Sequence, residues 1–178
     1  MALDLSDFDL PTHNFSHFVR ALNKRGQKRL QFESSLVYLQ LPNFNKSPGL
    51  DFHEDLPRLF DWLRRQGVKT MYDLRVPDSF SNPVPDETIE ELLHENFKIW
   101  EFDWRKLDLS IDVIEVAAKD VKRLHLYTTG NWPVLFYWAT SNIRRKLLEV
   151  CRPLNLNHSH DWLTISEARR TYSNIYRG

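Results

Sequence analysis

The chain has 178 residues, and its 24 lysines and arginines balance its 24 aspartates and glutamates, so its formal net charge is zero. A balanced chain has no overall electrostatic field to hold nucleic acid or an anionic membrane. The single cysteine, Cys151, excludes an internal disulfide and suits a reducing compartment, so we expect a cytoplasmic protein. Residues 1–10 lack the basic and apolar regions of a signal peptide, and no apolar run is long enough to span a bilayer.

Residues 1–33 differ in composition from the rest of the chain, and we predict that they form an N-terminal arm. Apolar residues between His13 and Leu22 have the spacing of one short amphipathic helix. The basic cluster Lys24–Arg29 is typical of a solvated turn, with a binding arm as the alternative. Residues 34–178 are predicted to form a single α/β domain.

The first predicted strand runs from Ser35 to Leu41 and is apolar on both sides, which indicates burial. After turn-forming residues, Asp55 is a predicted N-cap, and Gly67 is well placed just after the C-cap of the same helix. The buried face of that helix is predicted to carry Leu56, Leu59, Phe60 and Leu63.

One alternating pattern of apolar and polar residues, typical of a half-buried strand, recurs four times. Its central apolar residues are Leu74, Phe102, Leu126 and Leu156, at spacings of 28, 24 and 30 residues. We therefore predict an α/β fold with a short parallel sheet of repeated strand–helix units, similar to a leucine-rich repeat. The predicted strands are residues 69–76, 98–104, 121–127 and 153–157, neighbours in chain order with helices on one side.

Apolar spacing predicts helices in the gaps between these strands. The first begins with acidic residues near Asp86 and buries Ile89, Leu92 and Leu93; the second begins at Ser110 or Asp112 and carries Ile111, Ile114 and Ala118. Helical spacing resumes with Ile143, Leu147, and Val150 or Cys151. In the strand at 98–104, the aromatic residues Trp100, Phe102 and Trp104 are predicted to point into the core.

No recognisable motif for a cofactor or a nucleophile occurs in the sequence. The five glycines are scattered, so there is no phosphate-binding loop, and Cys151 lies among apolar residues, as a structural thiol would. His158 and His160 stand two apart beside Asp161, but a metal site needs further ligands that the sequence does not place nearby. We therefore expect neither a cofactor nor a metal ion.

The outward residues of the predicted strands form a mixed polar set. It comprises Asp73, Arg75, Glu101, Asp103, His125, Tyr127 and Asn155. A carboxylate and histidine cluster of this kind could serve acid–base catalysis, but parallel neighbours would also place Arg75 beside Asp103 and Glu101 beside His125, giving ion pairs without catalysis. Trp132 and Trp138 are candidate aromatic anchors for a partner, with core packing as the alternative.

Residues 60–138 contain several distinctive strings, among them Phe60–Leu63, Pro85–Glu90, Asp103–Leu109 and His125–Asn131. This segment resembles an accessory domain of fungal multidomain proteins that precedes a subtilisin-like serine protease or another effector module. The resemblance implies a regulatory or interaction domain. The Asp-Ser/Thr-Gly, His-Gly-Thr and Gly-Thr-Ser strings of the protease itself are missing from this sequence.

These observations lead to one principal hypothesis and two alternatives. The principal hypothesis is a non-enzymatic interaction or regulatory domain of an intracellular multidomain protein, which binds a protein partner or a neighbouring domain through the polar face of the sheet. The first alternative is a hydrolase that uses the carboxylate and histidine cluster. The second is a weak nucleic-acid binder that uses the basic cluster Lys24–Arg29 and the tail residues Arg169, Arg170 and Arg177.

Overall fold

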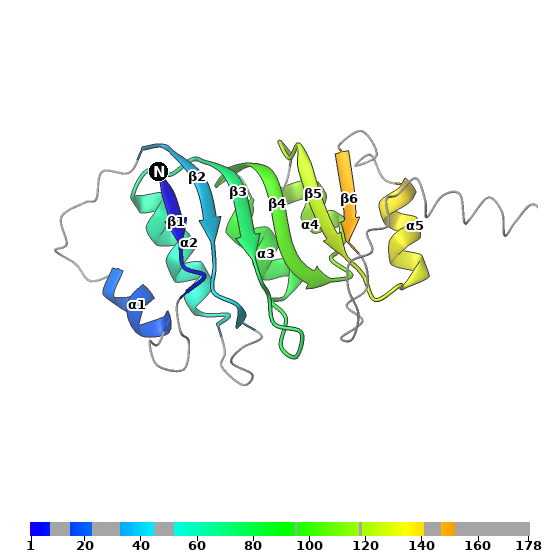
Figure 1. The fold of residues 1–178 in the computed structure, drawn as a ribbon, viewed down its shortest axis with the longest axis horizontal. Helices are drawn as coiled ribbons and strands as arrows, with labels where there is room; N and C mark the ends of the chain where they lie inside the picture. The colour runs from blue at the N-terminus through cyan, green and yellow to red at the C-terminus, as the bar shows by residue number, and fades with distance from the viewer. Residues whose placement is uncertain are drawn as a thin grey trace, which may run out of the picture.

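A computed structural model describes residues 1–7, 15–22, 33–44, 52–94, 96–117, 119–140 and 147–151. These residues form a six-stranded sheet whose strands are all parallel and stand in chain order, from β1 to β6. Helices α2, α3 and α4 lie on one face of the sheet, behind the strands in the view of Figure 1. The strands are β1 (Ala2–Asp4), β2 (Ser35–Gln40), β3 (Thr70–Val76), β4 (Lys98–Leu107), β5 (Arg123–Tyr127) and β6 (Leu147–Cys151). The helices are α1 (Phe15–Leu22), α2 (Asp55–Arg65), α3 (Asp86–Leu93), α4 (Ile111–Ala117) and α5 (Trp132–Thr140).

The predicted α/β class is confirmed, and so is the predicted parallel order of the strands that correspond to β3, β4 and β5. The predicted fourth repeat strand, residues 153–157, lies outside the described residues. The helical spacing predicted through Leu147 and Val150 was wrong, because these residues belong to β6 and pair with Arg123 and Leu126 of β5. A short apolar run fits the helix and strand periods almost equally well, so pairing with a neighbouring strand decides between them.

Part of the predicted N-terminal arm contributes to the sheet and to the core. β1 pairs with β2, and Leu5, Phe15 and Val19 are buried in the same apolar cluster as the helix-covered face of the sheet. The predicted short helix corresponds to α1, whereas the basic cluster Lys24–Arg29 lies outside the described residues. The domain boundary at residue 33 stays a prediction.

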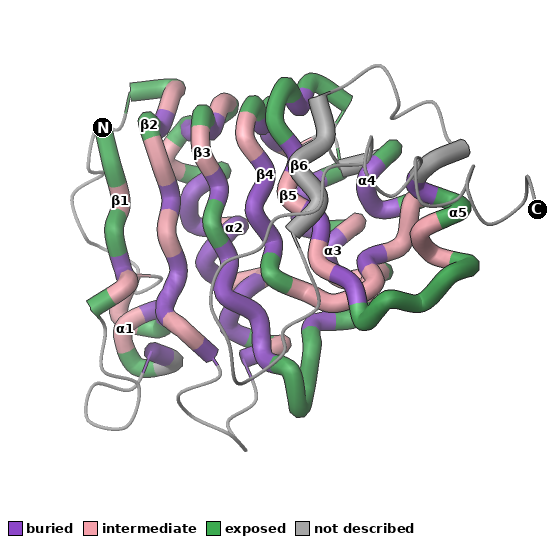
Figure 2. Tube along the Cα trace, turned by 45° about the vertical axis from the view of Figure 1, so that its right-hand side comes forward, coloured by how far each residue is buried: buried purple, intermediate pink, exposed green. Residues whose placement is uncertain are grey.

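One pattern of burial recurs along the strands β2 to β5. A buried apolar residue is followed by two residues that are exposed or half-buried. Two further buried apolar residues then follow, with one polar residue between them. In Figure 2, buried positions in purple are interrupted along these strands by half-buried and exposed positions in pink and green. The buried residues are Leu36, Leu39 and Leu41; Met71, Leu74 and Val76; Ile99, Phe102 and Trp104; and Val121, Leu124 and Leu126.

This pattern corrects the predicted orientation of Trp100. Its side chain is exposed, whereas Phe102 and Trp104 point into the core as predicted, with 0 % exposure each. Two outward positions, not one, separate Ile99 from Phe102, so strict alternation fails at the start of β4 and Trp100 lies on the open side.

The helices pack on the sheet largely through the predicted residues. The four predicted apolar residues of α2 and the three of α3 are all buried. Asp55 was wrongly predicted as an N-cap: it is the first helical residue, Glu54 occupies the cap, and Asp55 accepts a hydrogen bond from Arg58. Gly67 follows the C-cap with φ +91°, a conformation that glycine adopts without steric cost. None of the described helices is long and apolar enough to cross a membrane.

Candidate functional site

The sheet face opposite α2, α3 and α4 carries two rows of charged side chains that run across neighbouring strands. The strand register aligns Asp73, Glu101 and Arg123 in the first row. It aligns Arg75, Asp103 and His125 in the second row. We call this surface, from β2 to β5, the open face. Six of the seven predicted site residues lie on it or at its edge, and Asn155 falls outside the described residues.

The prediction that Glu101 and His125 are register neighbours was wrong, because Glu101 stands opposite Arg123, but the two side chains still meet diagonally. Arg123 Nη1 donates a hydrogen bond of 2.7 Å to Glu101 Oε2. The other carboxylate oxygen of Glu101 lies 3.1 Å from His125 Nε2. Glu101 is thus shared between its register neighbour Arg123 and the diagonal residue His125.

Arg75 and Asp103 are register neighbours, as predicted, but their hydrogen bonds go elsewhere. Arg75 donates to Asp73 in its own strand, with Nη2 2.6 Å from Oδ2. That hydrogen bond, with the nearby carboxylate charges, raises the pKa of Arg75. Asp103 instead accepts a 2.7 Å hydrogen bond from the Tyr127 hydroxyl and a 3.2 Å hydrogen bond from Arg105 Nη2. Sequence reasoning missed Arg105, although its i+2 spacing from Asp103 places it on the same side of β4.

The open face is layered, with carboxylates below and guanidinium groups above. The side chains of Asp73, Glu101 and Asp103 are 18 %, 23 % and 8 % exposed, whereas those of Arg75, Arg123 and Arg105 are 44 %, 55 % and 48 % exposed. Burial acts to lower the pKa of Arg105, but the charge and hydrogen bond of Asp103 outweigh it, so the pKa is raised. The arginines are therefore held by buried or half-buried acceptors and present their cationic ends outward.

An aromatic cluster lies at the start of the same strands, and sequence reasoning missed it. The rings of Tyr72 and Trp100 meet edge to face at 4.7 Å, and both residues are exposed. Lys122 Nζ lies 3.8 Å from the centroid of a Trp100 ring, a cation–π contact. The apolar spacing of the strands could have revealed this cluster. Two residues stand between the first two buried positions of each strand, and Tyr72 and Trp100 are the first of these two residues in β3 and β4.

The two predicted aromatic anchors lie on α5, away from this cluster. Trp138 is buried and its Nε1 donates a 3.0 Å hydrogen bond to the Leu109 carbonyl, so it packs in the core. Trp132 is 46 % exposed. Because α5 lies at the β6 end of the sheet, Trp132 is not brought together with the charged rows (Figure 1).

The carboxylates that could have served acid–base chemistry have partners on the open face. Asp73 holds Arg75, Glu101 holds Arg123 and His125, and Asp103 holds Tyr127 and Arg105. Within the described ranges, no group of three or more histidine, cysteine, aspartate or glutamate residues is placed to hold a metal ion. His158 and His160 lie outside those ranges. The arrangement is that of cross-strand pairing.

Two other carboxylates lie at the carboxyl ends of the strands and fasten loops. Asp78 is buried and accepts hydrogen bonds from Trp104 Nε1 at 2.9 Å and from the backbone amides of Ser79 and Val84. Burial raises the pKa of Asp78, against the effect of these donors. Asp108, at φ +53°, accepts a 2.7 Å hydrogen bond from the Thr128 hydroxyl. These contacts order the connections that follow β3, β4 and β5.

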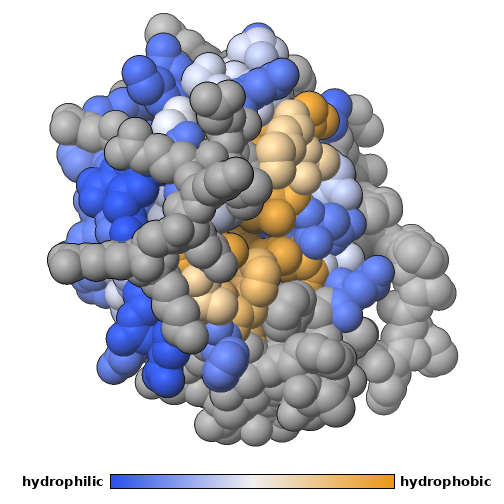
Figure 3. Space-filling view, turned by 90° about the vertical axis from the view of Figure 1, so that its left-hand side faces the viewer, coloured by the Kyte–Doolittle hydropathy of each residue, from blue (hydrophilic) through white to orange (hydrophobic). Residues whose placement is uncertain are grey.

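The β1 edge of the sheet has a different surface character. Figure 3, which views the molecule from that side, shows apolar atoms gathered between hydrophilic ones. The exposed apolar side chains at this edge include Met1 and Val37, whose backbones are joined by a 2.7 Å hydrogen bond from the Val37 amide. Val37 stands between Leu36 and Tyr38, which pair with Met71 and Asp73, so this surface continues toward Tyr72 of the aromatic cluster.

Comparison with known proteins identified no relative of this chain. No protein-family model matches the chain, and no match was found among curated proteins or among solved structures. The resemblance to the fungal accessory domain therefore stays a prediction.

Proposed function

We propose that this chain is a non-enzymatic interaction domain that binds a protein partner, or a neighbouring domain of the same protein, through the open face. A regulatory role in an intracellular multidomain protein, as the fungal accessory domain implies, belongs to the same proposal. The observation that carries it is the presence of arginines held by carboxylates beside an exposed Trp–Tyr pair, on the sheet face over which no helix of the described residues lies.

The topology supports this choice of surface. Parallel sheets are normally covered on both faces by crossover helices. Here the strands follow one another in chain order, so right-handed crossovers bring α2, α3 and α4 to the same side. In the described part of the chain, no helix lies over the open face (Figure 1). A partner would complete the second layer.

The side chains on this surface also support binding. Arginine and tryptophan are enriched among residues that dominate binding energy, and side chains already held in place lose less entropy on association. Arg75, Arg105 and Arg123 face outward, so the surface favours a partner that presents carboxylates, with an apolar or aromatic side chain against Trp100.

A leucine-rich-repeat-like character is part of the proposal. The burial pattern of β2 to β5 has the apolar spacing of the L-x-x-L-x-L repeat. Repeats of that kind stack strand–helix units and use the exposed strand face for binding. The apolar spacing of the strands and the position of α2, α3 and α4 on one face of the sheet agree with such a stack.

Matched single substitutions test the proposal. The tagged chain is used to capture partners, and the affinity of each purified partner is then measured with four variants. We expect Arg123→Glu and Trp100→Ala each to weaken binding by about tenfold or more, because both remove contacts at the centre of the surface. The controls are Arg65→Glu on α2, with 53 % exposure against 55 % for Arg123, and Trp132→Ala on α5.

Two results would overturn the proposal. One is equal binding by the open-face variants and their controls. The other is a catalytic activity of the purified chain that His125→Ala alone removes, which would favour the hydrolase. Far-ultraviolet circular dichroism of each variant shows whether the fold is retained, so loss of binding and loss of structure are distinguished.

A further inference from the structure

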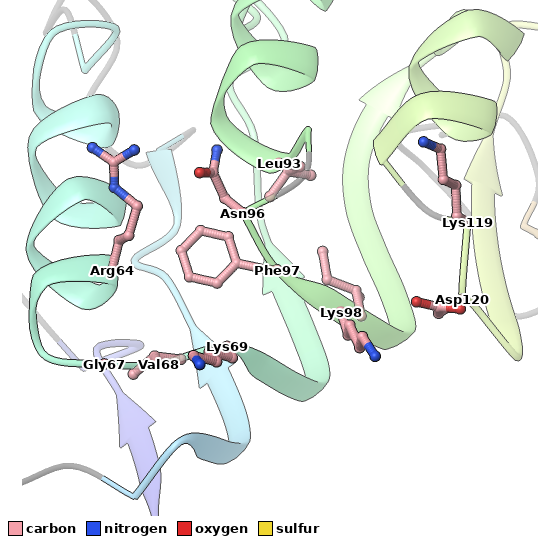
Figure 4. A pocket seen from close by; sticks show the side chains of 11 residues that line it. Arg64, Gly67, Val68, Lys69, Leu93, Asn96, Phe97, Lys98, Lys119 and Asp120 are labelled. Atoms are coloured by element: carbon pink, nitrogen blue, oxygen red, sulfur yellow. The ribbon is translucent and has the colours of Figure 1, made fainter.

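A cavity of about 570 Å³ opens at the starts of β3 and β4, at the opposite end of the strands from the loops that Asp78 and Asp108 fasten. It lies between the segments that follow α2, α3 and α4 (Figure 4). Its size falls within the range of about 300–1,000 Å³ that small-molecule sites occupy. None of the charged residues of the two rows lines it.

The inner wall of this cavity is apolar. The Phe97 ring projects into the space between the ends of α2 and α3 in Figure 4, with 8 % exposure, and Val68 beside it is 1 % exposed. A Cβ built on Gly67 would meet no atom within 4 Å, so the space over that residue is open. The wall can therefore receive a flat or apolar group.

The polar lining is mainly cationic. Arg64, Lys69, Lys98 and Lys119 contribute to it, against the single carboxylate of Asp120. Arg64 is partly compensated by its ion pair with Asp61. Arg64 and Lys119 lie in or just after the last turns of helices, where cations suit the helix dipole.

The helix dipole does not explain why Lys69 and Lys98 line the cavity. They stand at the starts of neighbouring strands, joined by a 2.8 Å hydrogen bond from the Lys98 amide to the Lys69 carbonyl. In the strand register Lys98 stands opposite Thr70, so Lys69 is one position away, and both lysines line the cavity. Within the residues that the structure describes, neither ammonium group has a carboxylate in ion-pair contact. A bound anion would give both ammonium groups a partner of opposite charge.

We propose that the cavity binds a small organic phosphate, with the phosphate at Lys69 and Lys98 and an apolar or aromatic group against Phe97. Lysine is a common phosphate ligand because its compact charge and three donors accept any oxygen geometry. A phosphate dianion matches two ammonium groups in charge. The site lies apart from the open face, so this proposal and the interaction proposal can fail independently.

Nuclear magnetic resonance titration of the ¹⁵N-labelled chain tests the site, with 1-naphthyl phosphate as the probe. We expect saturable shifts of the Val68, Lys69 and Lys98 amides, and weaker binding of both inorganic phosphate and 1-naphthol. Lys69→Gln and Lys98→Gln should each raise the dissociation constant about threefold to tenfold, since each removes one charge-assisted contact. Lys122→Gln, which removes an equal charge from the open face, should leave it unchanged.

Three results would overturn the proposal: no shifts at these amides, equal weakening by Lys122→Gln, or inorganic phosphate binding as tightly as 1-naphthyl phosphate. The phosphate could belong to a soluble metabolite or to a lipid headgroup. Co-sedimentation with phosphatidic acid vesicles distinguishes the two sources. Sedimentation that Lys69→Gln removes supports the lipid form of the proposal, and its absence, with amide shifts present, supports the soluble form.

Discussion

The two faces of the sheet are made by the same strands but depend on different forces. On the helix-covered face, Phe102 and Trp104 are fully buried and their rings stack at 6.1 Å. On the open face, the residues between and beside them form ion pairs whose arginines are about half exposed. Burial of apolar surface is worth much more than exposed ion pairs. The covered face therefore carries most of the stability, and the charge pattern of the open face is free to serve recognition.

The largest expected effect comes from removing a ring on the covered face. Phe102→Ala should lower the free energy of unfolding by about 3–5 kcal/mol, because it leaves a cavity in the core. Trp100→Ala, two residues earlier in the same strand, should cost about 1 kcal/mol or less, because its ring is on the open face. Chemical denaturation of both variants measures the difference. Equal losses would show that the two faces are not divided as described.

A smaller effect is expected at the loop carboxylate Asp78. Asp78→Ala should lower the free energy of unfolding by about 2–3 kcal/mol, because Trp104 Nε1 and the amides of Ser79 and Val84 lose their buried acceptor. The paired change Asp73→Ala on the open face should cost less, since water can replace it as the partner of Arg75. Thermal and chemical denaturation at neutral pH compare the two, and an equal cost would contradict the role given to Asp78.

The pH dependence of the same variant sharpens this comparison. Because burial raises the folded-state pKa of Asp78 above 3.8, the native chain takes up this proton before the unfolded chain does. The stability contributed by protonation is fully present below pH 3.8 and is lost as the pH rises through the folded-state pKa. The difference in unfolding free energy between the wild type and Asp78→Ala should therefore increase on acidification through this window. A difference that does not change with pH would contradict the raised pKa.

The smallest effect is expected from an exposed ion pair. Arg123→Gln should lower the free energy of unfolding by less than about 1 kcal/mol, because Arg123 is 55 % exposed and its attraction to Glu101 is screened by water. The loss should shrink further at high salt. Denaturation at low and high salt measures it. A loss as large as that of Phe102→Ala would mean that the open face is part of the stabilising core.

Much of the fold could be predicted because alternation and apolar spacing are local signals. They located β3, β4 and β5, the buried faces of α2 and α3, and the glycine that ends α2. β1 escaped because it has only three residues, and its strand character depends on pairing with β2. α5 escaped because its residues are apolar all round and show no helical periodicity.

The site was predicted less completely, because register alone does not determine which side chains bond. The register places Arg75 beside Asp103, as predicted, but the two side chains bond to other partners. The structure shows Asp103 buried and bonded to Tyr127 and Arg105, so a cation at position 103 would lose both partners and be desolvated. Nor could spacing reveal the cavity, because its lysines come from segments that only the fold brings together.

The chain-order arrangement of the strands also affects how this protein can fold. Paired residues on neighbouring strands are separated by only 20 to 36 positions along the chain. The entropy cost of closing a loop rises only slowly with its length, so the cost is similar for each pair of neighbouring strands. No strand depends on a distant part of the chain for its pairing. The sheet can form first between any two neighbours and then grow outward in both directions, as in stacked-repeat proteins. Folding of a parallel sheet, a slow process when the connections are long, becomes here a succession of short steps.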